Sequence, residues 1–239
     1  MSADWLTRAV YAHRGWHGDG RTENSPSAFR AAIAAGLGIE CDIQQSADGE
    51  PMVFHDWELD RLTAERGPVR RRTARELGGI PLIGGAPIWT LSMLLDEVAG
   101  RVPLLIEIKS RRGVPYERLC YGIARSFDSY PGDVAVMSFD PRVPRWFGRN
   151  LPDLALRGLV VTDSDSALWR RWALWRARPQ FLAYDVRSLP SRLAAAQRAK
   201  GLPILTWTVS DRTRLERARI HADAPIAEGE GLAFAMRDA

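Results

Sequence analysis

Residues 38–55, GIECDIQQSADGEPMVFH, contain two apolar runs, GIECDI and PMVFH, separated only by QQSADGE. A parallel crossover needs about a dozen residues or more, whereas Asp48-Gly49 is a pair that favours a tight turn between antiparallel strands. The stretch therefore predicts an antiparallel hairpin. This hairpin decides the fold, because its second arm no longer counts among the strands of a parallel sheet.

Short apolar runs alternate with segments of helical length along the rest of the chain. The other strand candidates are AVYAH, PLLIEIK, VAVMSF, LRGLVV, FLAYDV, ILTWTV and APIAEG. Helical candidates include SPSAFRAAIAAG, YERLCYGIARSFD, SALWRRWALWRAR and LPSRLAAAQRAKG; the first has Ser25 as N-cap, Pro26 in its first turn and Gly36 as its stop. Repeated strand–helix units predict a parallel sheet with helices outside it.

The strand count favours a closed barrel. Nine candidates less the second hairpin arm leave eight β/α units, and no G-x-G-x-x-G loop follows the first strand. We therefore predict a (β/α)8 barrel with a hairpin extension after strand 2, rather than an open doubly wound sheet. No linker divides the chain, so residues 1–239 are expected to form one domain, with the arginine-rich segment 56–85 as a surface excursion.

Composition excludes several classes of protein. The apolar fraction of 46% is enough for a core, and the net charge of +4 is too mild to indicate nucleic-acid binding. Cys41 and Cys120 form no disulfide framework and no paired metal spacing. The N-terminus lacks the pattern of a signal peptide, and no run approaches the roughly 20 apolar residues of a membrane span. We expect a cytoplasmic protein whose oligomeric state is undetermined.

Polar residues gather at strand ends, where barrels of this type carry their active sites. Glu40 and Asp42 lie two apart and so share one side of their strand. A hairpin that turns on Asp48-Gly49 places Asp42 opposite His55, and a shift of one residue pairs Glu40 with His55 instead. In either register these three side chains share a face.

The same pattern recurs on neighbouring units. Glu107 and Lys109 end the run LLIEIK, and His13 and Arg14 directly follow the first strand. Burying three carboxylates together without a cation would force large pKa shifts. An oxygen-only set suits Mg²⁺ or Ca²⁺, with Mn²⁺ as an alternative, whereas zinc is disfavoured. Together with Arg14 and Lys109 such a cation makes a pocket for a phosphate or phosphodiester, and two histidines supply the two proton transfers of P–O cleavage.

The motifs HRG, ENS, IECDIQQSADGEPMVFHDWELDRLT, LLIEIK and LTWTV, in order from Ala12 to about Val209, resemble the glycerophosphodiester phosphodiesterase family. The resemblance implies a TIM barrel and metal-dependent hydrolysis of a glycerophosphodiester to an alcohol and glycerol 3-phosphate, an activity of lipid and glycerol metabolism. It implies the following roles: catalytic His13 and His55; substrate-binding Arg14, Lys109 and Trp207, the last against the glycerol; and metal ligands Glu40, Asp42 and Glu107.

The sequence departs from the family pattern at a few places. Ser25 stands where members often carry Thr, and Trp89 stands where a Pro is common. The last strand, APIAEG, lacks the usual Thr-Asp pair, and Glu228 is a candidate substitute. Glu23 and Asn24 are expected to brace the loop after the first strand, Glu23 by pairing with Arg14. The roles of His17 and Asp56 stay open.

Two other functions are compatible with these residues. The chain could be a phospholipase acting on intact phospholipid, as in the related sphingomyelinase D-like and phosphatidylinositol-specific phospholipase C-like barrels, or a non-catalytic barrel that binds a phosphate ligand. The presence of all the expected catalytic, phosphate and metal residues argues against the second. The helix expected over 167–178 carries an arc of Leu168, Trp169, Trp172 and Trp175. We expect this arc to pack on the barrel wall, with contact to an anionic membrane as the alternative.

Overall fold

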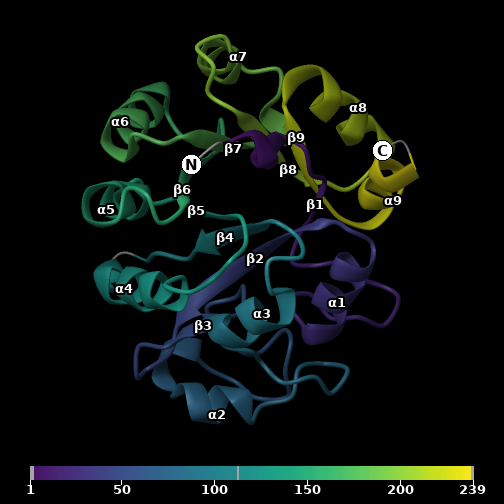
Figure 1. Cartoon of the computed structure of the whole chain (residues 1–239), viewed down its shortest axis with the longest axis vertical. Helices are drawn as coiled ribbons and strands as arrows, with labels where there is room; N and C mark the ends of the chain where they lie inside the picture. Colours follow the sequence, from purple (N-terminus) through teal and green to yellow (C-terminus); the bar gives the residue numbers. More distant parts are fainter. Residues whose placement is uncertain (1–2, 112, 238–239) are drawn as a thin grey trace.

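Eight parallel strands close into a barrel, as the sequence predicts (Figure 1). The computed structural model describes residues 3–111 and 113–237. The sheet order is β1-β9-β8-β7-β6-β5-β4-β2-β3, and the pairing of β1 with β2 closes the ring and leaves β3 outside it. The strands are β1 (Tyr11–Ala12), β2 (Gly38–Gln45), β3 (Pro51–Val53), β4 (Leu104–Ile108), β5 (Val134–Ser138), β6 (Leu156–Val161), β7 (Phe181–Asp185), β8 (Ile204–Val209) and β9 (Ala224–Ala227).

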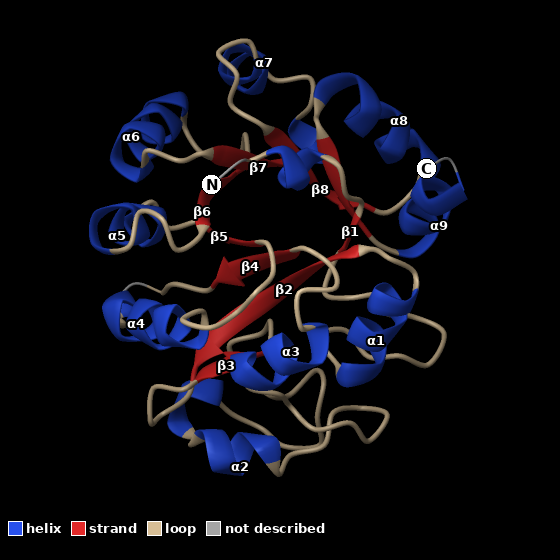
Figure 2. Cartoon of the chain, in the orientation of Figure 1, coloured by secondary structure: helices blue, strands red, loops and turns tan. Residues whose placement is uncertain are grey.

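Helices surround the ring and cover the outer face of the strands (Figure 2). They are α1 (Pro26–Ala34), α3 (Leu91–Val98), α4 (Tyr116–Ser126), α5 (Arg142–Asn150), α6 (Ala167–Ala177), α7 (Arg192–Arg198), α8 (Arg212–His221) and α9 (Gly229–Arg237). The predicted start of α1 is confirmed, because the Ser25 side chain accepts a hydrogen bond from the Ala28 N–H. Among the described residues no helix is long and apolar enough to cross a membrane.

Alternation along each strand separates two apolar layers. In β2, Ile39, Cys41 and Ile43 face the helices and join the larger outer core. Inside the barrel the core is built from residues such as Leu105 and Phe181, and Leu6 of the short helix η1 (Asp4–Thr7) packs against it. Glu40, Asp42 and Gln44 alternate with these residues and point inward above this packed interior. Polar residues are thus confined to the C-terminal end of the barrel.

The hairpin is confirmed, but both expected registers are wrong. Ile43 pairs with Val53, and the Phe54 N–H donates to the Asp42 carbonyl at 3.0 Å. The connection is a three-residue loop, in which Ser46 and Glu50 pair and Gly49 takes a φ of 93°. Such a loop combines a type I turn with a left-handed glycine and centres the pairing on one residue instead of between two.

The segment after β3 forms more than the expected surface excursion. It contains the short helices η2 (Val69–Arg71) and α2 (Ala74–Gly78), which lie outside the ring in Figure 1. Its apolar side chains meet those of the hairpin in a separate cluster made of Met52, Phe54, Leu59, Leu62, Val69, Leu77, Ile80, Leu82 and Ile88. This cluster anchors the segment beside the barrel mouth.

Helix α6 differs most from expectation. Ala173 and Ala177 are the residues buried against the barrel, and Trp169 is only partly buried beside them. Leu168, Trp172 and Trp175 keep 79%, 47% and 68% of their surface exposed. The expectation that the whole arc packs on the barrel wall is therefore wrong. Small alanines allow a closer approach of helix to sheet than tryptophans would.

Candidate active site

Three carboxylates from adjacent strands converge inside the C-terminal end of the barrel. Glu40 and Asp42 come from β2, and Glu107, which pairs with Asp42 in the register, comes from β4. Oxygen atoms of the three lie within 4.8 Å of one another, and all three side chains are almost fully buried. So much negative charge away from water is unfavourable unless protons or cations compensate it.

Two basic side chains compensate part of this charge. Lys109 Nζ lies 2.8 Å from Asp42 Oδ1 and 2.6 Å from Glu107 Oε1, and Arg14 Nε lies 3.3 Å from Asp42 Oδ2. Burial by itself would raise the pKa of Asp42, but Lys109 and Arg14 hold it well below its usual range. Burial, followed by the charge of Asp42, raises the pKa of Glu40 to about 7. Glu40 is thus the point where further positive charge would be most favourable.

The loop after β1 is tied to this cluster. Arg14 has a φ of 54°, a left-handed conformation that costs a residue with a side chain about 1–2 kcal/mol. Its backbone N–H donates to Glu40 Oε2 at 3.0 Å, and its guanidinium donates to Glu23 at 2.7 Å. Asn24 donates to Asp42 Oδ2 at 2.9 Å and accepts from the Asp42 N–H at 3.3 Å. Glu23 and Asn24 therefore brace the loop, as expected.

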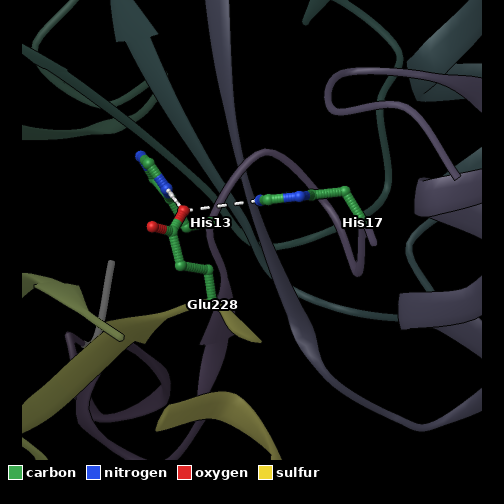
Figure 3. A group of neighbouring side chains, drawn as sticks. All are labelled: His13, His17 and Glu228. Carbon is green, nitrogen blue, oxygen red and sulfur yellow. Dashed lines mark hydrogen bonds and ion pairs between the residues drawn. The ribbon is translucent and has the colours of Figure 1, made fainter. Parts of the chain in front are cut away.

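His13 is oriented by a carboxylate from the far end of the chain. Its Nδ1 lies 2.6 Å from Oε2 of Glu228, which follows β9, the neighbour of β1 in the ring. Figure 3 shows His17 approaching the same oxygen from the other side, with Nε2 at 3.4 Å. Desolvation would lower the pKa of His13, but the bond to Glu228 and the charge of Glu40 raise it.

The bond to Glu228 also decides which ring nitrogen of His13 faces the site. The hydrogen bond from His13, and then the nearby His17, hold the pKa of Glu228 well below its usual range, so its carboxylate is ionised and accepts the Nδ1 proton. The Nε2 atom of His13 then points toward the carboxylate cluster, 3.9 Å from Glu40 Oε2.

His55 has a partner of the same kind. Its Nδ1 lies 2.6 Å from Asp56 Oδ1, and Arg61 Nε donates to the other Asp56 oxygen at 2.5 Å. The terminal nitrogens of Arg61 donate to Glu23 at 2.9 and 2.7 Å. Because Glu23 also binds Arg14, one chain of ion pairs connects the loop after β1 with the segment after β3. Strand β3 ends at Val53, two residues before His55, so the alternation of side chains along the strand does not set the direction of His55. The chain turns after the strand and places His55 at the barrel mouth.

A cavity of about 550 Å³ opens beside these groups. Its lining includes His55, Glu107, Lys109 and Phe139. Trp207 meets Phe139 edge-on, with ring centroids 5.4 Å apart, and its indole N–H donates to the Ala183 carbonyl at 2.9 Å. The cavity is of the size that small-molecule ligands occupy. Its aromatic lining is Trp57 and Phe139, and Trp207 lies behind Phe139.

The carboxylate cluster fits a hard divalent cation. It offers oxygen donors alone, they converge from two rigid strands, and Glu40 lacks full compensation by the protein. His13, His17 and Glu228 also lie close together, but the 2.6 Å contact from Nδ1 to Oε2 is that of a hydrogen bond, which satisfies the pair without an ion.

Sequence reasoning left out three members of this arrangement. No local sequence pattern marks Arg61 or Phe139, and the sequence left the role of Asp56 open. The neighbouring pair His55-Asp56 was the available signal, since a carboxylate beside a histidine is a common orienting partner. Glu228 was noticed only as a substitute for a missing Thr-Asp pair.

Comparison with known proteins agrees with this geometry. A model of the glycerophosphoryl diester phosphodiesterase family matches residues 13–225. A glycerophosphodiester phosphodiesterase of Caldanaerobacter subterraneus is 27% identical over 224 residues, which are 87% of this chain and 88% of that protein.

Solved structures share the fold. A phosphodiesterase of Oleispira antarctica, in complex with the product sn-glycerol-3-phosphate, aligns over 100% of both chains with a TM-score of 0.86 at 22% identity. A glycerophosphodiester phosphodiesterase of Thermotoga maritima aligns over 92% of this chain and 93% of its own with a TM-score of 0.76 at 24% identity. The expected fold, family and enzyme class are confirmed: the chain belongs to the glycerophosphoryl diester phosphodiesterase family of phosphoric diester hydrolases.

Proposed function

We propose that this protein hydrolyses water-soluble glycerophosphodiesters to an alcohol and glycerol 3-phosphate, using one divalent cation and two histidines. The observation that carries the proposal is the pair of histidines, His13 and His55, each with Nδ1 2.6 Å from a carboxylate. They border the buried carboxylate cluster that Arg14 and Lys109 also contact. The product bound in the Oleispira antarctica structure supports glycerol 3-phosphate as the product here.

The phosphate would lie between the basic side chains and the carboxylate cluster. Arg14 has five N–H donors and uses only part of them on Glu23, and Lys109 supplies a second positive charge. Glu40, Asp42 and Glu107 would hold Mg²⁺, Ca²⁺ or Mn²⁺, which supplies further stabilisation of the negative charge on the phosphoryl oxygens.

The two histidines would move the protons. One takes the proton of the attacking hydroxyl. This hydroxyl belongs either to water or, in a route whose first step is intramolecular, to the substrate's own glycerol. The other protonates the alcohol oxygen as its bond to phosphorus breaks. Each transfer is typically worth about 10²–10⁴-fold in rate. The Nδ1–carboxylate contacts hold both rings with Nε2 directed away from the partner, and Trp207 with Phe139 would wall the glycerol side of the cavity.

Glycerol 3-phosphate release from a panel of glycerophosphodiesters tests the proposal. Chelation should abolish release, and Mg²⁺, Ca²⁺ or Mn²⁺ should restore it. His13→Ala and His55→Ala should each lower kcat at least about 100-fold, whereas His221→Ala, on α8, should not. Activity that survives chelation contradicts the role of the cation, and full activity of His13→Ala contradicts the role of the histidines.

The same assay separates the alternative functions. Faster cleavage of phosphatidylcholine than of glycerophosphocholine would point to a phospholipase. Binding of glycerol 3-phosphate without turnover of any diester would point to a non-catalytic barrel.

We also propose a domain organisation and a cellular location. Residues 1–239 would form one domain, which is supported by the closure of one sheet through strands from both ends of the chain. A cytoplasmic location is supported by the two free cysteines, which suit a reducing compartment.

A further inference from the structure

Helices α5 and α6 carry an apolar ridge beside a cluster of unpaired arginines. The ridge consists of Leu168, Trp172 and Trp175, which are spaced by three and four residues and so lie in one row on α6. All three are substantially exposed, and none belongs to the catalytic mouth. Exposed large apolar residues that gather in one patch mark interaction sites more often than scattered ones do.

Arginines border this ridge on both sides. Arg171 lies four residues before Trp175 and Arg176 four residues after Trp172, so each is a direct neighbour on the helix surface. Neither helix contains an acidic residue. No ion pair is found for Arg171, Arg176 or the α5 residues Arg145 and Arg149 within the described part of the chain.

The groove between the two helices is also basic. A cavity of about 350 Å³ lies there, lined by Tyr116 of α4 together with Arg142, Arg145, Trp146, Arg149, Asn150 and Arg176. Arg142 is paired with Asp140, but Arg145, Arg149 and Arg176 have no carboxylate beside them in this lining. The arginines are close enough to affect one another. The pKa of Arg145 is lowered by desolvation and then by the charges of its neighbours, which are Arg178, Arg149 and Arg176. Such a cluster favours an anionic partner.

We propose that this α5–α6 face docks on an anionic lipid surface. The indole and leucine side chains of the ridge would enter the interface between headgroups and acyl chains, where tryptophan is favoured, and the arginines would bind lipid phosphates. An exposed apolar row suits the acyl-chain boundary of such a surface, and the flanking arginines suit its anionic headgroups. A second copy of the chain fits less well, because a twofold interface would place Arg171 and Arg176 of both copies against each other.

Vesicle flotation tests the proposal with the full-length protein. The protein should bind vesicles made of equal parts phosphatidylcholine and phosphatidylglycerol. It should bind vesicles of phosphatidylcholine alone about tenfold more weakly, and it should dissociate from the anionic vesicles as the salt concentration rises. The Trp172→Ala/Trp175→Ala double variant should weaken binding about tenfold or more. Neutralising Arg149 and Arg176 with Gln should weaken binding about fivefold for each residue.

Matched controls lie on other surfaces. Ile220→Ala removes a side chain that is 67% exposed on α8, and Arg66→Gln removes an exposed charge from the segment after β3; neither should change binding. All variants should keep the wild-type rate on a water-soluble diester, because no substituted residue lies in the active site. Failure of the wild-type protein to bind anionic vesicles overturns the proposal. So does equal binding by the ridge variant, or a dimer in solution that the ridge variant abolishes.

Discussion

Glu228→Gln should uncouple His13 from its orienting charge while leaving the fold intact. The substitution keeps the size of the side chain and its capacity to hydrogen bond, and it removes only the negative charge that lies 2.6 Å from His13 Nδ1. Glu228 directly follows β9 at the barrel mouth and is only partly buried, so the thermal unfolding midpoint should change little.

The size of the effect follows from the hydrogen bond. A bond to a charged group is worth about 1.5–3 kcal/mol and a neutral one about 0.5–1.5 kcal/mol, so the change removes about 1–2 kcal/mol from protonated His13. At about 1.4 kcal/mol for each pKa unit, the pKa of His13 should fall by about one unit. Because Glu228 favours the protonated ring, its loss moves proton release to lower pH. Whether His13 acts as base or as acid, loss of its ionic partner should lower kcat about 10- to 100-fold.

The kcat/KM–pH profile measures both consequences. The limb that reports His13 should move about one unit toward lower pH, and the limb that reports the other histidine should stay in place. Glu230→Gln, an exposed carboxylate two residues along, is the matched control and should give the wild-type profile. An unshifted profile with unchanged kcat in Glu228→Gln would refute the claim that this carboxylate orients His13.

Three other substitutions test neighbouring parts of the structure. Asn24→Ala removes two buried hydrogen bonds to Asp42 and should lower the free energy of unfolding by about 1–3 kcal/mol in denaturant titration; an unchanged midpoint would show that the brace is dispensable. Asp56→Asn leaves His55 without its ionic partner and should lower kcat about 10- to 100-fold with little change in the pH limb of His13, so a shift of that limb would contradict separate orienting carboxylates. Trp207→Ala should raise KM for glycerophosphodiesters more than it lowers kcat in steady-state assays, and an unchanged KM would place the glycerol elsewhere.

The sequence alone determined the order of elements and the inward direction of the metal-binding candidates. Strand and helix periods are local properties, so the β/α repeats and the hairpin were readable without coordinates. Glu40 and Asp42 share the inner face because residues two apart on any strand do. The register of the hairpin was not readable in the same way, because it depends on the turn that Ala47, Asp48 and Gly49 adopt, and two-residue and three-residue loops differ by one step.

Only the tertiary structure decided which carboxylate serves which histidine. His13 and Glu228 are 215 positions apart, and they meet because barrel closure makes β1 and β9 neighbours. Arg61 joins Asp56 to Glu23 across a segment whose path no local pattern specifies. Helix α6 shows the same limit: its sequence contains an arc of tryptophans, but packing against the barrel decided that alanines face inward and that Trp172 and Trp175 face out.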